Sequence, residues 1–305
     1  MYLLERQKED GDVDDKGKRT LRLHMPQWQG GVLNEYHLSS QLLSWLLPTS
    51  DGPSETVEVI APDQAHRPLR TEDGMLEKAA LLDQAKAARL AIERHMPDRI
   101  LTIGGDCLVD LAPIAYLNKR YNGRLGVLWI DAHPDVQTFK ETHQGNAQVL
   151  GMLLGRGDPD FVAEVDVPVD PACVMYAGLD EWSSSEDEVL RDLSLRRTGS
   201  EELFPASTPI IGWLVEQRID HVAVHLDVDA IIPARFGPIL FNKPNPETGF
   251  LAGVPRGRLE PDTVFRLLND VAMRADIVGL AITEYISWDV IQTRQLLARL
   301  PLIGQ

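Results

Sequence analysis

The chain has 305 residues, 44% of them hydrophobic, so it is long enough to bury a sizeable core. Its formal charge of −16 argues against a nucleic-acid partner, which would need a basic face, and is compatible with a cationic substrate. The two cysteines imply no disulfide framework, and no apolar window approaches the roughly 18 residues of a membrane span. The charged first residues lack the apolar stretch of a secretion signal, so we expect a cytoplasmic protein without a membrane partner.

Strand-like and helix-like patterns alternate along the chain after a charged segment at residues 5–19, which we expect to form a mobile arm. Strands are predicted at residues 21–24, 56–60, 99–103, 127–130, 172–177, 221–226 and 277–283. Helices are predicted at residues 37–47, 76–95, 108–121, 149–154, 186–195, 209–218, 260–275 and 290–300. No linker-like composition divides the sequence. We therefore expect one α/β domain over residues 1–305, with a parallel sheet covered by helices on both faces.

Polar side chains of unusual kinds follow four of the predicted strands. They are the motifs GGDC at 104–107, DAHPD at 131–135 and DVD at 227–229, and Glu284. The carboxyl ends of parallel strands meet at one edge of a sheet, so we expect these side chains to converge. Many carboxylates in one cleft repel one another unless cations neutralise them, which two divalent metals would do. The alternative is that each aspartate caps the helix after its strand, which explains one or two of them.

The four motifs, in this order and at these separations, resemble the ureohydrolases, a superfamily that includes arginases, agmatinases and formimidoylglutamases. The resemblance implies a three-layer α/β sandwich with a central, mostly parallel sheet of about eight strands. It also implies a binuclear manganese centre whose metal-bridging hydroxide attacks the carbon of a guanidinium or amidine group. Members of the superfamily are often trimers or hexamers, so a homo-oligomer is expected.

Roles for individual residues follow from the resemblance. Asp131 and Asp227 would bridge the two metals. Asp135 would bind the first metal and orient the hydroxide. Glu284 would bind the guanidinium group, where a carboxylate offers paired acceptors to a planar cation. The complete set of implied metal ligands is Cys107, Asp131, His133, Asp135, Asp227 and Asp229.

Cys107 is the main departure from the superfamily pattern, which usually reads GGDH at this point. A thiolate is a softer ligand than an imidazole and would shift the metal preference from manganese toward zinc or iron. Cys107 could equally be an ordinary buried cysteine, with the first metal weakly held or absent. Both interpretations stay open at this stage.

Further departures concern proton transfer and substrate binding. Arginases carry a histidine before Gly-Met, whereas Leu150 stands there in this chain, so His143 is the candidate proton shuttle. Ser183 stands where arginases have an aspartate for the substrate's α-amino group, so arginine itself is not the expected substrate. The residues predicted to contact the substrate are Gln137, Asn146, Ser183 and Glu284. The loop at residues 232–258 is a candidate wall of the pocket.

Three functional hypotheses result. The first is a metal-dependent hydrolase of linear C–N bonds in a small cationic guanidino or amidino compound. The second is a non-catalytic binding or regulatory protein with an impaired metal site, which the missing imidazole and missing shuttle would favour. The third is a different metal-dependent hydrolysis on the same scaffold, because a fold does not fix a function.

Overall fold

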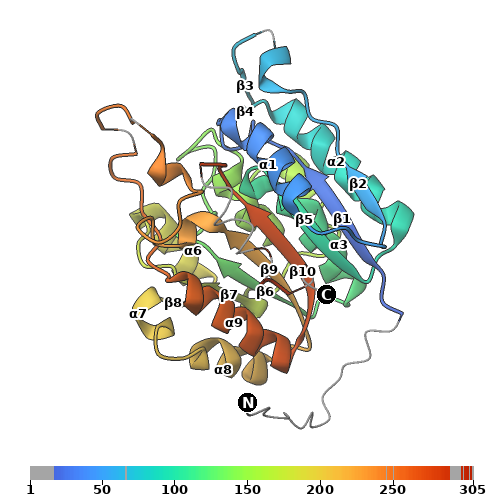
Figure 1. Ribbon diagram of the computed structural model, residues 1–305, viewed down its shortest axis with the longest axis vertical. Coiled ribbons are helices and arrows are strands. Elements are labelled where there is room, and N and C mark those ends of the chain that lie inside the picture. The colour runs from blue at the N-terminus through green and yellow to red at the C-terminus, as the bar shows by residue number, and fades with distance from the viewer. Residues whose placement is uncertain are drawn as a thin grey trace, which may run out of the picture.

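A parallel sheet forms the centre of the protein in a computed structural model that describes residues 17–65, 67–244, 246–249, 251–288, 297, 299–301 and 303 (Figure 1). Within these residues the sheet has eight strands in the order β2-β1-β5-β10-β9-β6-β7-β8. Every strand pairing in it is parallel. The strands are β1 (Thr20–Met25), β2 (Ser54–Thr56), β5 (Arg99–Gly104), β6 (Leu125–Ile130), β7 (Val174–Ala177), β8 (Arg196–Thr198), β9 (His221–Asp227) and β10 (Asp276–Thr283). A separate antiparallel pair joins β3 (Thr71–Glu72) to β4 (Met75–Leu76).

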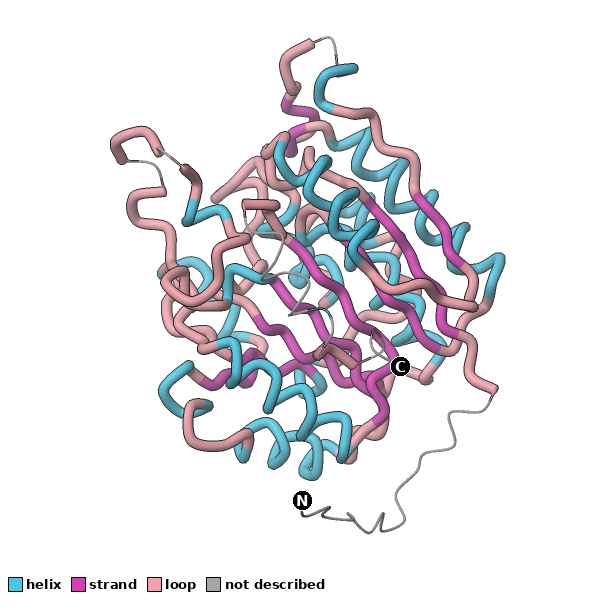
Figure 2. Tube along the Cα trace, viewed as in Figure 1, coloured by secondary structure: helices cyan, strands magenta, loops and turns pink. Residues whose placement is uncertain are grey.

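Helices cover both faces of the sheet, which gives the predicted three layers (Figure 2). The helices are α1 (Glu35–Leu46), α2 (Lys78–His95), α3 (Leu111–Arg120), α4 (Val149–Leu153), α5 (Pro159–Val162), α6 (Ser184–Asp192), α7 (Ser200–Leu203), α8 (Thr208–Gln217) and α9 (Pro261–Arg274). Side chains of α2, α3, α4 and α6 share one core with the sheet, and those of α1, α8 and α9 share the other. No helix within the described residues is long and apolar enough to cross a membrane.

The strand β6 shows why the sequence makes this sandwich. All six of its residues are buried, as expected for a central parallel strand. Val127 and Trp129 face the core under α2 and α3, whereas Leu128 and Ile130 face the core under α8 and α9. Because successive side chains of a strand point to opposite faces, a continuous apolar run serves both cores.

Most predicted elements are confirmed, with boundary shifts of a few residues. The strand predicted at residues 56–60 is wrong in position, because the chain pairs with β1 only over Ser54–Thr56. The edge strand β8 and the β3–β4 pair were not predicted. The predicted helix at 108–121 begins as a 3₁₀ turn at Cys107–Asp110, and α3 starts at Leu111. Most of the predicted arm at 5–19 and most of the closing helix at 290–300 lie outside the described residues.

Candidate metal centre

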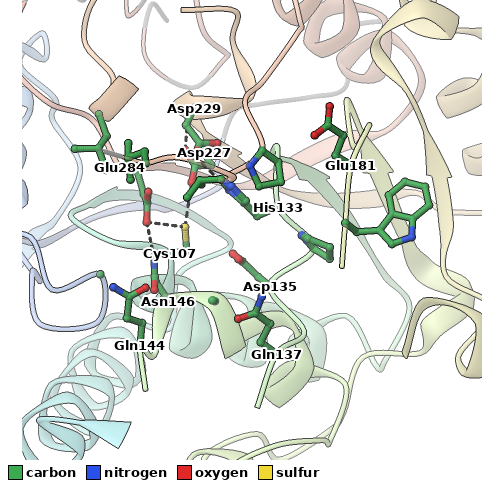
Figure 3. Close-up of a pocket in the computed structure, with 18 of the residues that line it drawn as sticks. Cys107, His133, Asp135, Gln137, Gln144, Asn146, Glu181, Asp227, Asp229 and Glu284 are labelled. Carbon is green, nitrogen blue, oxygen red and sulfur yellow. Dashed lines mark hydrogen bonds and ion pairs between the residues drawn. The ribbon is translucent and has the colours of Figure 1, made fainter. Parts of the chain in front are cut away.

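The four polar motifs converge at the carboxyl edge of the sheet, where β5, β6, β9 and β10 lie side by side. Asp131 begins the loop directly after β6, Asp227 is the last residue of β9, and Glu284 follows β10. Cys107 reaches the same place from the 3₁₀ turn after β5. Figure 3 shows the side chains of Cys107, Asp227 and Glu284 pointing into one cavity.

Two glycine positions hold the GGDC turn against its neighbours. A Cβ atom on Gly105 would lie 1.6 Å from the Gln27 carbonyl oxygen, so the close backbone approach requires glycine. Gly30 packs in the same way against the Asp106 carboxylate, at 2.5 Å. Asp106 caps the 3₁₀ turn by accepting a hydrogen bond from the Leu108 amide at 3.1 Å. The capping alternative therefore describes Asp106 and also Asp227, whose side chain caps the 3₁₀ turn at Val228–Ala230.

The DAHPD and DVD motifs fold alike at their first residues. The Asp131 carboxylate accepts a hydrogen bond from the His133 amide at 2.7 Å, and the Asp227 carboxylate accepts one from the Asp229 amide at 2.7 Å. Each aspartate thus forms a tight local turn that a short polar side chain can stabilise. The turn brings the third residue of each motif, His133 or Asp229, toward the same point.

Two site carboxylates sit on strained backbone. Asp135 has φ +53° and Glu284 has φ +58°, both in the left-handed region that residues other than glycine seldom adopt. Such a conformation costs about 1–3 kcal/mol and persists where the surrounding structure imposes it, which is common at functional sites. In both residues the backbone turns a carboxylate into the cavity.

Asp131, His133 and Asp229 form a first group, which we call the His133 cluster. His133 Nδ1 lies 3.4 Å from Asp131 Oδ1 and 3.3 Å from Asp229 Oδ2. Burial opposes the charged imidazole, but the two carboxylates outweigh it and raise the pKa of His133 well above its usual range. Burial would also raise the pKa of Asp131, but hydrogen bonds from His133 and His225 lower it to about 2.

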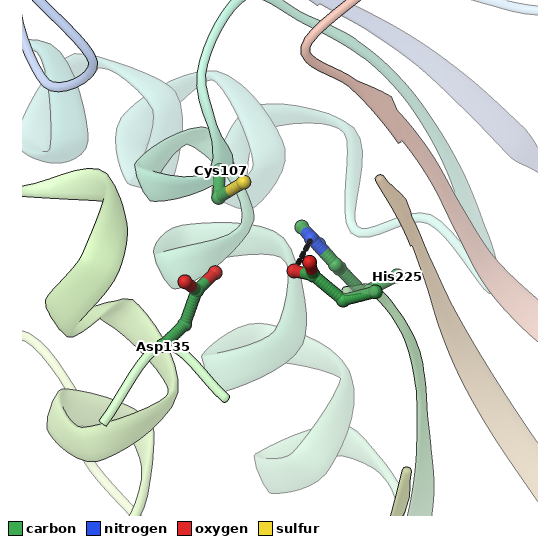
Figure 4. A group of neighbouring side chains, drawn as sticks. Cys107, Asp135 and His225 are labelled. Atoms are coloured by element: carbon green, nitrogen blue, oxygen red, sulfur yellow. Dashed lines mark ion pairs between the residues drawn. The ribbon is translucent and has the colours of Figure 1, made fainter. Parts of the chain in front are cut away.

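Cys107, Asp131, Asp135 and His225 form a second group, which we call the Cys107 cluster (Figure 4). All four residues are buried, and their ligand atoms lie within 4.8 Å of one another. Burial, reinforced by the charge of Glu284, raises the pKa of the Cys107 thiol well above its usual range. Burial and the neighbouring Asp131 likewise raise the pKa of Asp135 well above its usual range.

Glu284 is held from two sides. The Tyr36 hydroxyl donates to Glu284 Oε2 at 2.6 Å, and Asn146 Nδ2 donates to Glu284 Oε1 at 2.7 Å. Cys107 Sγ lies 3.6 Å from Oε1 and 3.3 Å from Asp227 Oδ2. Burial, together with the charge of Asp229, raises the pKa of Glu284 to about 6.

Among the predicted metal ligands, three buried polar atoms have no hydrogen-bond partner in the described part of the chain. They are Asp135 Oδ2, Asp229 Oδ1 and His133 Nε2. An unpaired buried polar atom costs about 1–3 kcal/mol, so a native site that keeps three of them needs a ligand. Carboxylate oxygens, imidazole nitrogens and a thiol are all metal donors, and the side chains present fit divalent cations.

A cavity of about 540 Å³ opens over these side chains. Its lining carboxylates are those of Asp135, Glu181, Glu186, Asp227, Asp229 and Glu284. No lysine or arginine belongs to the described residues that line it. Part of the wall comes from the loop predicted at 232–258, through Leu240, Phe241, Leu251, Gly253, Val254 and Pro255. The described lining of the cavity is therefore rich in acidic groups and contains no lysine or arginine.

The structure places most predicted site residues at this cavity. Five of the six predicted metal ligands line it, and Asp131 lies fully buried beside them in both clusters. Gln137, Asn146 and Ser183 also line the cavity. Gln137 Nε2 donates to Glu186 Oε1 at 2.9 Å. Ser183 forms a capping box with Glu186 at the start of α6, so its hydroxyl serves the helix.

His143 is the exception, because it does not line the cavity. Its ring is exposed, and Nδ1 lies 2.7 Å from the Gly74 carbonyl oxygen. The backbone carbonyl of His143 also accepts a hydrogen bond from the Leu76 amide at 2.8 Å. These contacts hold His143 against the β3–β4 turn, so its placement does not support the expected shuttle role.

Three residues at the site were not expected from the sequence. His225 lies within β9, Asp110 lies in the turn before α3, and Tyr36 lies in α1. His225 Nδ1 is 2.8 Å from Asp110 Oδ2, and both side chains are buried. One available signal was that His225 and Asp227 stand two residues apart on a strand, which places both on one face.

Comparison with known proteins agrees with this architecture. The sequence profile of the arginase family matches residues 49–237, which is more than half of the chain. An arginase of Staphylococcus aureus (strain MRSA252) is 25% identical over 175 residues, covering 54% of this chain and 55% of that arginase. The chain therefore spans little more than half the length of this curated relative in the alignment.

Two solved structures share the fold over nearly the full chain. An arginase from Bacillus caldovelox superposes with a TM-score of 0.73 at 20% identity, covering 92% of this chain and 95% of that one. The formimidoylglutamase of Bacillus subtilis superposes with a TM-score of 0.64 at 12% identity, covering 99% and 97%. The sheet and its carboxylate-rich edge define an arginase-like α/β fold, as the motifs predicted. The chain belongs to the arginase family.

Proposed function

We propose that this protein is a metal-dependent hydrolase of linear C–N bonds in a small guanidino or amidino compound. The observation that carries the proposal is the pair of clusters that share Asp131, at the strand ends of an arginase-family fold. The carboxylates lie close together, and some of their oxygens have no hydrogen-bond partner among the described residues. Such an arrangement suits a centre of two divalent cations. We propose manganese as the metal, with zinc or iron favoured if Cys107 is a ligand. When bound, such a pair supplies an acidified water as the nucleophile.

The chain's own residues would place the reacting groups. Asp135, with an unpaired Oδ2, can accept a hydrogen bond from the attacking water and orient it. Glu284 offers carboxylate oxygens to a guanidinium group. Tyr36 and Asn146 each hold one of its oxygens, which fixes the carboxylate plane before the substrate arrives.

The cavity also narrows the substrate class. Six lining carboxylates favour a cation, and the lack of lysine or arginine among the described lining residues leaves a substrate carboxylate without a cationic partner. Ser183, which stands at the expected α-amino contact, is occupied by its capping box. We therefore propose a guanidino or amidino compound other than arginine, with a neutral or positively charged far end.

Assembly into a trimer or hexamer and a cytoplasmic location stay predictions of the sequence. The second hypothesis, a non-catalytic protein with an impaired metal site, has one observation in its favour: Cys107 Sγ lies within hydrogen-bond distance of Asp227 and Glu284, as a protonated thiol would. The metal content of the purified protein separates it from the hydrolase.

The test of the proposal is a substrate screen with the metal-loaded full chain. Guanidino and formimino compounds are incubated with it, and the release of urea, ammonia or formamide is measured. We expect turnover of at least one cationic compound, little turnover of arginine, and a loss of about 10²–10³ in kcat for Glu284→Gln. Glu93→Gln, at an exposed position of α2 that does not line the cavity, is the matched control and should keep most activity. A protein that holds two metals and releases no product from any compound would contradict the proposal.

A further inference from the structure

His225 is a fully buried histidine in the middle of the sheet. It lies on β9, two residues before Asp227, and its ring stacks on the Trp129 indole of β6 with centroids 3.6 Å apart and planes at 7°. The ring is therefore fixed in orientation by the neighbouring strand. No role for it follows from the motifs at the strand ends.

The two ring nitrogens of His225 have different surroundings. Nδ1 lies 2.8 Å from Asp110 Oδ2, which is a well-formed hydrogen bond. Nε2 has looser neighbours, with the Thr283 hydroxyl at 3.4 Å and Asp131 Oδ2 at 3.7 Å. With the proton on Nδ1, the Nε2 lone pair points into the Cys107 cluster. A carboxylate behind a histidine that faces a metal is the usual second layer of a metal site.

The other members of the Cys107 cluster supply the remaining donors. Cys107 contributes a thiol, and Asp131 and Asp135 contribute carboxylates. One of these carboxylate oxygens, Asp135 Oδ2, has no hydrogen-bond partner among the described residues. All four residues are buried, and two of them, Cys107 and Asp135, line the cavity. Four donors that include a thiolate and an imidazole match the preference of zinc.

We infer that His225 supplies the imidazole for the first metal and, together with Cys107, forms a thiolate–imidazole site on the buried side of the centre. Asp110 is then a positioning residue that fixes the tautomer and orientation of the ring. The inference deepens the proposed function and rests on it, because it names the residues that replace the histidine expected at position 107. It also predicts that this half of the centre prefers zinc or cobalt to manganese.

Cobalt substitution of the full chain tests the inference without measuring activity. Cobalt(II) bound by a thiolate has a charge-transfer absorption in the near ultraviolet, and elemental analysis counts the cobalt per chain. We expect this absorption in the wild-type protein and its loss in Cys107→Ser. His225→Ala should weaken the binding of one cobalt ion by about 10–100-fold or more and remove the absorption band. Asp110→Asn should weaken the binding of the same ion by about 10–100-fold. His221→Ala, on the same strand at its far end, is the matched control and should leave both readouts unchanged.

Two results would overturn the inference. One is an unchanged cobalt content and thiolate band in His225→Ala. The other is a wild-type protein that binds cobalt without any thiolate band, because Cys107 would then not be a ligand. If His225→Ala does not fold, the paramagnetically shifted ring N–H signal of a cobalt-bound histidine is sought in the wild-type protein and in His225→Gln. His133 accounts for a second such signal, so the loss of one shifted signal in His225→Gln supports the inference, and the same set of signals in both proteins overturns it. A failed substrate screen would contradict the proposed hydrolysis and leave these metal readouts unaffected.

Discussion

Two of the three ligand groups of the candidate centre, the His133 cluster and the Cys107 cluster, share Asp131 but differ in how they are built. The His133 cluster comes from two adjacent strand ends, and His133 is partly exposed to the cavity. The Cys107 cluster is entirely buried and draws on the turn after β5, the loop after β6 and the interior of β9. The first uses the D-x-H and D-x-D spacings of the sequence, whereas the second depends on tertiary packing. Under the proposal, one half of the metal site keeps the spacing of the family motifs and the other half is rebuilt around His225.

We expect the largest effect from a substitution of Asp131, the residue that both clusters share. Asp131→Asn removes a carboxylate from both clusters, so we expect the loss of both metals and a fall in hydrolysis of about a thousandfold or more. Asp229→Asn removes a carboxylate from the His133 cluster alone and should spare the metal held by Cys107. Metal content and turnover are measured on the same samples. Equal metal loss in both variants would show that the two clusters do not bind independently.

Metal binding should also stabilise the fold. A ligand at about a hundred times its Kd adds about 2.7 kcal/mol to the free energy of unfolding for each site. We expect thermal unfolding of the chelator-treated protein at a lower temperature than that of the manganese- or zinc-loaded protein. Zinc should stabilise Cys107→Ser less than the wild type, while manganese should stabilise the two proteins similarly. The same shift with zinc in both proteins would remove Cys107 from the ligand set.

His24, a buried histidine outside the centre, has a pKa that is shifted in the opposite direction from that of His225. His24, in β1, faces the Ser40 hydroxyl at 3.0 Å, and burial lowers its pKa to about 4. His225, between Asp110 and Asp131, has its pKa raised to about 9 although burial alone would lower it. The contrast shows that neighbouring carboxylates decide whether the pKa of a buried histidine is raised or lowered.

The folded pKa of His24 lies below the unfolded value of about 6.5, so the unfolded chain binds more protons between these values. The contribution of neutral His24 is complete above about pH 6.5 and is lost as the pH falls toward about 4. We expect it to remove about 2 kcal/mol of stability between about pH 6.5 and 5. The free energy of unfolding, measured with urea at several pH values across this range, should change less with pH in His24→Gln than in the wild type. An equal pH dependence in the two proteins would show that His24 does not titrate as described.

The sequence was informative where local pattern decides structure. The runs that form β5, β6, β9 and β10 are apolar because both faces are covered, and the polar residues at their ends mark the site. The edge strand β8, Arg196–Thr198, was missed because it is short and only partly buried, so it lacks that apolar signal. The single-domain expectation for residues 1–305 stays a prediction.

For two residues at the site the sequence was not enough, because contacts between distant parts of the chain decide where a side chain lies. His225 was missed because its donor role depends on Asp110 and Cys107, which are more than 100 residues away in the chain. His143 was expected at the cavity because it lies near the motif, but its hydrogen bonds direct it to the β3–β4 turn. Spacing along one strand end is visible in a sequence. Packing between distant elements is not.

The most direct test of the two-metal proposal is the metal content of the full chain. The purified protein is reconstituted separately with manganese and zinc, excess metal is removed, and each metal is counted by elemental analysis. The proposal predicts about two ions per chain, with the Cys107 cluster filled more tightly by zinc. A content near zero after both reconstitutions would contradict it, because the converging carboxylates would then not form a working centre.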